Sequence, residues 1–156
     1  NKIKYIVESK KAVVYENNDN IFFIFAPVIT KTFQNEKRAL EMANQIKEIL
    51  SYHNKLFKQK INFGISLNYG AIVAKQTQKG LEFMSFGDLM SQAKRVSSVS
   101  SEEVLLADKM RERFGGSIKT EKSAKNGVSS HIVKDLRNNV EGEKFIRKFL
   151  ERMDKK

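Results

Sequence analysis

Few side chains in this sequence combine chemically useful groups with an informative position. The 156 residues include no cysteine, which removes thiol catalysis, redox switching and zinc–thiolate sites. The two histidines are interpreted as structural, since His53 closes an apolar helical stripe and His131 lies in an alternating strand pattern. The sequence has neither a glycine-rich phosphate loop followed by Lys-Ser/Thr nor a Ser-His-Asp arrangement. The remaining candidates are acidic residues beside turns, Asp19 within Asn-Asp-Asn and Asp88 before a predicted helix.

The charge balance is the most unusual bulk property. Lys and Arg total 29 and Asp and Glu total 18, which gives a formal net charge of +11. A basic chain favours polyanionic partners such as nucleotides, nucleic acid or an anionic membrane surface. Because the lysines are spread along the chain, a solvated basic surface is the simpler interpretation. The sequence has no apolar run near the ~20 residues that span a bilayer and no visible signal peptide, so we expect a cytoplasmic protein.

The hydrophobic pattern predicts alternating helices and strands. A hydrophobic fraction of 40% and this length suit one globular domain. The predicted order is a helix end at 2–7, a hairpin of strands 12–15 and 21–25, a helix at 35–58, a long strand at 61–74, a polar turn at 75–80 and a strand at 81–86. A helix at 88–96, a serine-rich connection at 97–101, a strand at 103–106, a helix at 107–114 and strands at 117–122 and 131–134 follow.

Three local patterns refine this order. The apolar run Phe22-Phe23-Ile24-Phe25 predicts a strand buried on both faces. Gly64 and Gly70 predict a bulge or a close approach of another backbone within the long strand. The tail at 141–153 reads as an amphipathic basic helix that packs on the domain or binds a partner or a membrane surface.

The predicted order indicates an α/β sandwich of the α+β kind, with an antiparallel sheet and helices mostly on one face. A ferredoxin-like βαββαβ core is compatible if one strand precedes Asn1. We expect one domain over residues 1–136, followed by the basic amphipathic helix at 137–156.

Four segments resemble motifs of the class III nucleotidyl cyclases, in the same order. They are the Val-Tyr-Glu-Asn-Asn-Asp-Asn-Ile-Phe-Phe-Ile-Phe hairpin at 14–25, the Phe-Gly-Ile-Ser-Leu-Asn-Tyr-Gly-Ala-Ile-Val-Ala strand at 63–74, the Phe-Gly-Asp-Leu-Met-Ser-Gln-Ala-Lys-Arg-Val helix start at 86–96 and the Ser-Glu-Glu-Val-Leu-Leu-Ala strand at 101–107 with Arg-Phe-Gly at 113–115. The correspondence runs from about residue 5 to 134. Each motif alone is weak, but four in order are fairly specific for the fold. The diguanylate cyclases fit less well, because both glycines of their hairpin motif are absent.

The resemblance implies a defined chemistry. In the family, two aspartates hold two Mg²⁺ or Mn²⁺ ions, which activate the ribose 3′-hydroxyl and neutralise the triphosphate of ATP or GTP. An asparagine and an arginine on a later helix orient the ribose and stabilise the phosphoryl charge. The family works as a head-to-tail dimer, so the resemblance also implies a homodimeric or heterodimeric partner.

Carried over by position, the catalytic set is incomplete. Asp19 falls on the second metal aspartate and Arg95 on the transition-state arginine. Ser91 replaces the ribose-orienting asparagine, and a hydroxyl cannot reproduce the planar amide geometry. The strand that would carry the first metal aspartate lies before Asn1 in this correspondence, and Asp88 is interpreted as a helix cap and not as its substitute.

The nucleotide-binding set is also altered. Tyr15 stands where the family has its purine-reading lysine, Asn18 stands at the glycine before Asp19, and Ser85 lies on the long hairpin that helps to read the base. We expect these three residues to contact any bound nucleoside triphosphate.

Three hypotheses follow. The first is a degenerate cyclase-like domain, a pseudoenzyme that binds ATP or GTP weakly or acts as a regulatory or dimerisation partner in cyclic-nucleotide signalling. The second is an active adenylate or guanylate cyclase, which forms a 3′,5′-cyclic nucleotide and pyrophosphate with its first metal aspartate supplied upstream or by a partner. The third, and less favoured, is a basic nucleic-acid-binding module that stacks bases on strand aromatics.

Overall fold

The computed structural model describes residues 2–17, 19–134 and 152, and these belong to two compact units. Within the described chain, the first unit extends to Phe63, and the second spans Gly64–Lys134. The predicted helix of the tail at 137–156 lies outside the described residues apart from Arg152.

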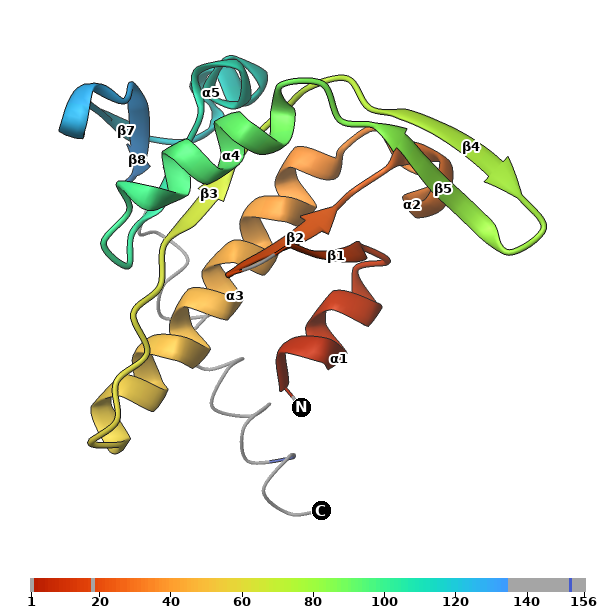
Figure 1. Cartoon of the computed structure of the whole chain (residues 1–156). Coiled ribbons are helices and arrows are strands. Elements are labelled where there is room, and N and C mark those ends of the chain that lie inside the picture. Colours follow the sequence, from red (N-terminus) through yellow and green to blue (C-terminus); the bar gives the residue numbers. More distant parts are fainter. Residues whose placement is uncertain (1, 18, 135–151, 153–156) are drawn as a thin grey trace. The chain divides into compact units, whose positions relative to one another are not determined.

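The first unit is built on one long helix. Its elements are α1 (Lys2–Ser9), β1 (Val13–Asn17), β2 (Asn20–Ile24), α2 (Pro27–Thr30) and α3 (Asn35–Leu56). Figure 1 shows α1 and the β1–β2 hairpin beside α3. The buried side chains recur along α3 at the helical spacing expected from the sequence, as Ala39, Met42, Ala43 and Ile46. Ile6 and Val7 of α1 and Ile24 of β2 are the other buried apolar side chains among the described residues of this unit, and Thr30 of α2 is buried as well.

The β1–β2 hairpin buries one face and exposes the other. Residues directly opposite in an antiparallel pair point to the same side, so the pairs Val13–Ile24 and Tyr15–Phe22 share the face that contains buried Ile24. Val14 and Ile21 lie on the opposite face and are exposed. The expectation that β2 is buried on both faces is therefore wrong. The described residues pair β2 with β1 alone, and Phe22 and Phe23 are half-buried.

The second unit contains the remaining strands and two helices. Its elements are β3 (Ile65–Leu67), β4 (Val73–Thr77), β5 (Gly80–Ser85), α4 (Leu89–Ser98), β6 (Val104–Leu106), α5 (Asp108–Phe114), the 3-10 turn η1 (Gly115–Ser117), β7 (Thr120–Ser123), the 3-10 turn η2 (Lys125–Gly127) and β8 (Ser130–Val133). A four-stranded sheet has the order β3-β6-β8-β7, and β4 and β5 form a separate hairpin.

Strand β6 occupies the centre of this sheet. It pairs with β3 in parallel and with β8 antiparallel, and all three of its residues are buried. Val96 and Val99, at the end of α4, cluster with Leu105 and Ala107 against Val128 and Ile132. The mixed α/β class is confirmed. Most of the described strand pairs are antiparallel, as expected, and the exception is β3, which pairs with β6 in parallel. The described strands form three separate sheets.

The long strand predicted at 61–74 is wrong in extent. Only Ile65–Leu67 and the start of β4 are strands, and the two glycines explain the interruptions. A Cβ built on Gly64 would lie 2.2 Å from the carbonyl oxygen of Ser97, and one on Gly70 would lie 3.0 Å from Leu89 Cδ1. Both glycines therefore permit the close approach that the sequence indicated.

Two smaller differences concern turns. The polar segment predicted as a turn at 75–80 continues β4 to Thr77 and turns only at Gln78-Lys79. Polar side chains are compatible with strand conformation here, because most residues of this hairpin are exposed to solvent. The sequence also missed α2, a four-residue helix that begins at Pro27, the only proline in the chain.

Candidate functional site

The hairpin of the first unit carries Tyr15 and Asp19. Asp19 is exposed within the two-residue turn between the paired residues Asn17 and Asn20. Tyr15 belongs to β1, is partly exposed, and its ring lies 6.3 Å from the Phe22 ring, centroid to centroid. The turn geometry therefore presents the Asp19 carboxylate to solvent. The third expected hairpin residue, Asn18, lies outside the described residues.

Helix α4 of the second unit carries Ser91 and Arg95. Residues four apart on a helix lie on the same face, one turn from each other. Both side chains are exposed, so a hydroxyl and a guanidinium share one open stripe of α4. This pairing can bind an anionic oxygen with Arg95 and a neighbouring hydroxyl group with Ser91.

The turn before α4 contains a hydrogen bond between a side chain and the backbone. Ser85, the last residue of β5, accepts a hydrogen bond at Oγ from the Gly87 amide at 3.2 Å. Gly87 has a φ of 53°, a conformation that favours glycine. Asp88 stands at the N-cap position, as expected, but its side chain makes no capping hydrogen bond. Ser85 is exposed, close in sequence to the start of α4.

The candidate residues thus fall into two groups. Tyr15 and Asp19 share one hairpin of the first unit, and Ser85, Ser91 and Arg95 follow one another through the β5–α4 connection of the second. Each group therefore lies within one unit of the chain.

The acidic side chains among the described residues do not fit a two-metal centre. Two divalent cations need several carboxylate oxygens around them. Across the part of the chain that the structure describes, no group of three or more His, Cys, Asp or Glu side chains could hold a metal ion. Asp19 alone would bind one hard cation weakly, and no reaction step is assigned to a metal here.

Comparisons with solved structures identify the fold. The catalytic core of a rhodopsin-guanylyl cyclase with converted specificity, in complex with ATPalphaS, matches with a TM-score of 0.63 and 19% identity over 85% of this chain and 76% of that one. The guanylyl cyclase Cya2 gives a TM-score of 0.65 and 15% identity over 88% and 78%. A non-canonical dimeric guanylyl cyclase domain of the RhoGC fusion protein from Blastocladiella emersonii gives 0.64 and 18% over 85% and 76%. The fold is that of a class III nucleotidyl cyclase catalytic domain.

This cyclase fold is supported by structure and not by close sequence relatives. No protein-family model matches the sequence, and no curated protein matches significantly. At identities below one fifth the likeness establishes the fold alone, and the chemistry depends on the residues. Because the similar solved structures are cyclase domains, they do not favour the hypothesis of a nucleic-acid-binding module. Among the described helices, none is long and apolar enough to cross a bilayer.

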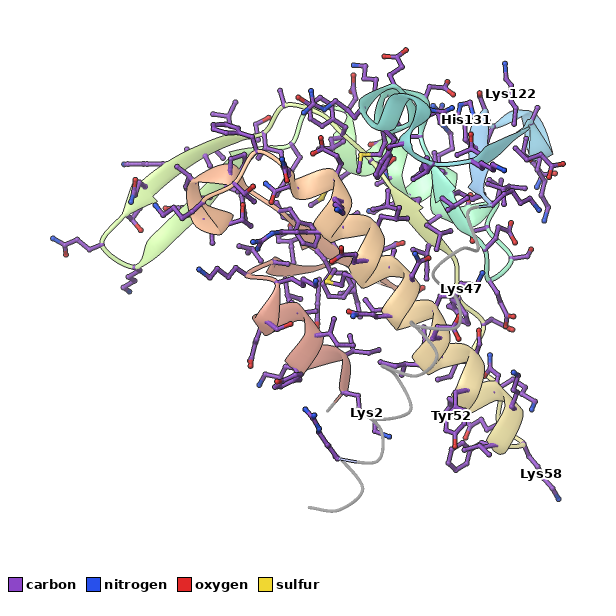
Figure 2. All side chains as sticks on the ribbon, turned by 180° about the vertical axis from the view of Figure 1, so that it is seen from behind. Lys2, Lys47, Tyr52, Lys58, Lys122 and His131 are labelled. Carbon is purple, nitrogen blue, oxygen red and sulfur yellow. The ribbon has the colours of Figure 1, made fainter. Side chains whose placement is uncertain are left out.

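Sequence reasoning missed one polar cluster on the cyclase-like second unit. Asp108 Oδ1 lies 2.8 Å from His131 Nε2 and accepts a hydrogen bond from Ser129 Oγ at 3.0 Å. The hydrogen bond from His131 is the main cause that lowers the pKa of Asp108, and Ser129 and the charge of Lys122 act in the same direction. Figure 2 labels His131 and Lys122, which are paired across β7 and β8.

His131 is therefore more than the surface strand residue predicted from its pattern. Its side chain is 17% exposed, while that of Asp108 is 58% exposed. The sequence contains no signal for this pair, because 23 residues separate its members and only the pairing of β6 with β8 brings them together. His53 is predicted to have a structural role at the end of a helix. Its ring stacks on the Phe57 ring at the end of α3, with 4.6 Å between the ring centroids.

Proposed function

We propose that this chain is a degenerate class III cyclase-like domain that binds a nucleoside triphosphate weakly and acts as a regulatory or dimerisation partner. The observation that carries the proposal is the exposure of Arg95 and Ser91 on one open face of α4 without a carboxylate cluster among the described residues. By the resemblance, Arg95 keeps a family position and Ser91 does not, so a phosphate contact is retained while the ribose contact is altered. A cytoplasmic location is part of the proposal.

Each group of residues offers its own contacts to a nucleoside triphosphate. Arg95 contacts the phosphates, because a guanidinium pairs bidentately with phosphate oxygens. Ser91 and Ser85 offer hydroxyls to the ribose and the base. Tyr15 offers a ring face and one hydroxyl where the family has a lysine, so base selection differs from the family's. Asp19, with Asn18 beside it, attracts a single Mg²⁺ or Mn²⁺ that accompanies ATP or GTP.

The partner role rests on analogy with a neighbour. One similar guanylyl cyclase domain is described as a dimer. In this chain the outer face of the β1–β2 hairpin exposes Val14 and Ile21, which gives an apolar surface available for a second copy or a related subunit.

The proposal is tested by measuring binding and product together. The longest natural form is incubated with ATP or GTP in Mn²⁺, cyclic nucleotide is sought by mass spectrometry, and affinity is measured by calorimetry. We expect weak binding and no cyclic product. Arg95→Ala should weaken binding about tenfold or more, because a charge-assisted contact is lost, and Lys58→Ala serves as the charge-matched control.

Two outcomes would overturn the proposal. A 3′,5′-cyclic nucleotide that disappears with Asp19→Ala and Arg95→Ala would make the chain a working cyclase, with its missing ligand supplied upstream or by a partner. Absence of nucleotide binding in millimolar Mn²⁺ would remove the nucleotide pocket from the proposal.

A further inference from the structure

We propose that the first unit carries a separate anion-binding pocket for a small phosphorylated molecule, lined by Lys10, Lys37 and Arg38. None of these residues belongs to either group of candidate nucleotide-binding residues. The inference is independent of the proposed function.

The pocket is a cavity of about 370 Å³ formed by three segments of the first unit. The end of α1, the connection between α2 and α3, and the first two turns of α3 line it. Its lining residues are Ser9, Lys10, Thr32, Gln34, Lys37, Arg38 and Glu41. Small-molecule sites commonly occupy roughly 300–1,000 Å³, so the cavity is of a size to hold a diphosphate or a small phosphate ester.

The charges around the cavity favour an anion. Three cationic side chains line it against one carboxylate, and Lys10 Nζ already lies 2.7 Å from Glu41 Oε2. Among the residues that the structure describes, Lys37 and Arg38 form no ion pair. Two cations therefore face the cavity without a counter-charge, and Lys10 becomes a third when an anion competes with Glu41.

The polar groups of the lining can also donate to phosphate oxygens. Thr32 Oγ1 accepts a hydrogen bond from the Gln34 amide at 3.1 Å, which leaves its hydroxyl proton available to a ligand. Arg38 supplies a planar fork that matches two phosphate oxygens, and Lys37 supplies a point charge. Every lining residue is polar, so the pocket suits an anionic group better than an apolar one.

Pyrophosphate is the direct probe, and calorimetry on the full chain is the measurement. We expect one saturable site. The double variant Lys37→Ala/Arg38→Ala should weaken binding about tenfold or more, since two charge-assisted contacts are lost. Glu41→Gln should strengthen binding severalfold by freeing Lys10. Lys58→Ala is the matched control, because Lys58 lies beyond the far end of α3, a helix roughly 33 Å long by its rise per residue.

The outcomes separate this pocket from the proposed nucleotide site. Loss of pyrophosphate binding in the double variant, with Arg95→Ala unaffected, supports the pocket even if no nucleotide binds elsewhere. Loss in Arg95→Ala with the double variant unaffected would overturn it and locate the anion at α4. Equal weakening by Lys58→Ala, or the absence of a saturable site, would also overturn it, because general attraction to a +11 chain would then explain any binding.

Discussion

Gly64 lies too close to Ser97 and Ser100 for a side chain to fit without a shift. Its missing side chain allows the Ser97 carbonyl oxygen to approach to a distance that no Cβ could accept. We predict that Gly64→Ala lowers the free energy of unfolding by about 1–3 kcal/mol, since the backbone must shift to relieve the contact. Urea denaturation measures the change.

The matched control for this substitution is Gly116→Ala. A Cβ built there meets no atom within 4 Å, so the change should leave stability within about 0.5 kcal/mol. If both alanine variants lost the same stability, the Ser97 contact would not be the reason for glycine at position 64.

Asp108 gives a prediction about pH. Its pKa is held below the usual value of 3.8, mainly by the hydrogen bond from His131. The folded state therefore prefers the ionised carboxylate. Its stabilisation is present above about pH 4 and is lost as the pH falls through the lowered folded pKa. Because Asp108 is more than half exposed, we expect the effect to be about 1 kcal/mol or less.

Comparison of the wild type with Asp108→Asn tests this sign. Urea denaturation at several pH values should show the wild type more stable near pH 7, with the difference shrinking towards about pH 3. A difference that grew on acidification would contradict the direction assigned to the pKa of Asp108.

These residues also show what the sequence could predict about the site. Asp19, Ser91 and Arg95 are assigned from short motifs whose local order survives in the chain, and their roles stay predictions. The Asp108–His131 pair was missed because it depends on strand pairing, which no local pattern encodes. The cavity beside α3 was missed for the same reason, since it needs α1 and the α2–α3 connection to meet.

Among the elements, β6 is the most completely buried. It is flanked on both sides by strands of its sheet, and Leu106 has 0% exposure. We predict that Leu106→Ala lowers the free energy of unfolding by about 2–5 kcal/mol, because the removed methyl groups leave a cavity in a close-packed core. Leu56→Ala, at the end of α3 where the side chain is 59% exposed, should cost less than about 1 kcal/mol.

Thermal or urea unfolding of both leucine variants provides the comparison. Similar losses at positions 56 and 106 would show that β6 is not the core strand of the second unit. The test depends on the relative cost, which is less sensitive to the unfolded state than either value alone.

Helices and hairpins were predictable to different degrees. Helix α3 was predicted within two residues, because seven recurring apolar or aromatic positions mark one face through more than four turns. The prediction for 61–74 was wrong because alternating apolar residues continue through Gly64 and Gly70. Periodicity does not register a close neighbour, which is a backbone carbonyl at Gly64 and the Leu89 side chain at Gly70. The prediction for β2 was wrong because a run of apolar residues does not determine how many strands pair with it.

At the scale of the whole chain, the class of fold was predictable and the sheet arrangement was not. Motif order and element order pointed to a cyclase-like α/β domain, and structural neighbours support that fold. The parallel pairing of β3 with β6 joins segments about forty residues apart. Such pairing is decided by packing of the whole unit and not by either strand's own residues.

The exposed face of the β1–β2 hairpin leads to a prediction about assembly. Ile21 is 59% exposed on that face, directly opposite Glu16, and a lysine in its place would bring a charged group into the contact, where its desolvation costs free energy even beside a carboxylate. If the chain self-associates through this face, Ile21→Lys should shift it to the monomer, with little loss of folding stability because the side chain is already exposed. Leu56→Lys makes the same chemical change at the end of α3 and should leave the assembly unchanged.

Sedimentation over a range of concentrations distinguishes the cases. A dimer that survives Ile21→Lys and dissociates with Leu56→Lys would assign the interface to α3, and a wild-type chain that stays monomeric would require a different subunit as its partner.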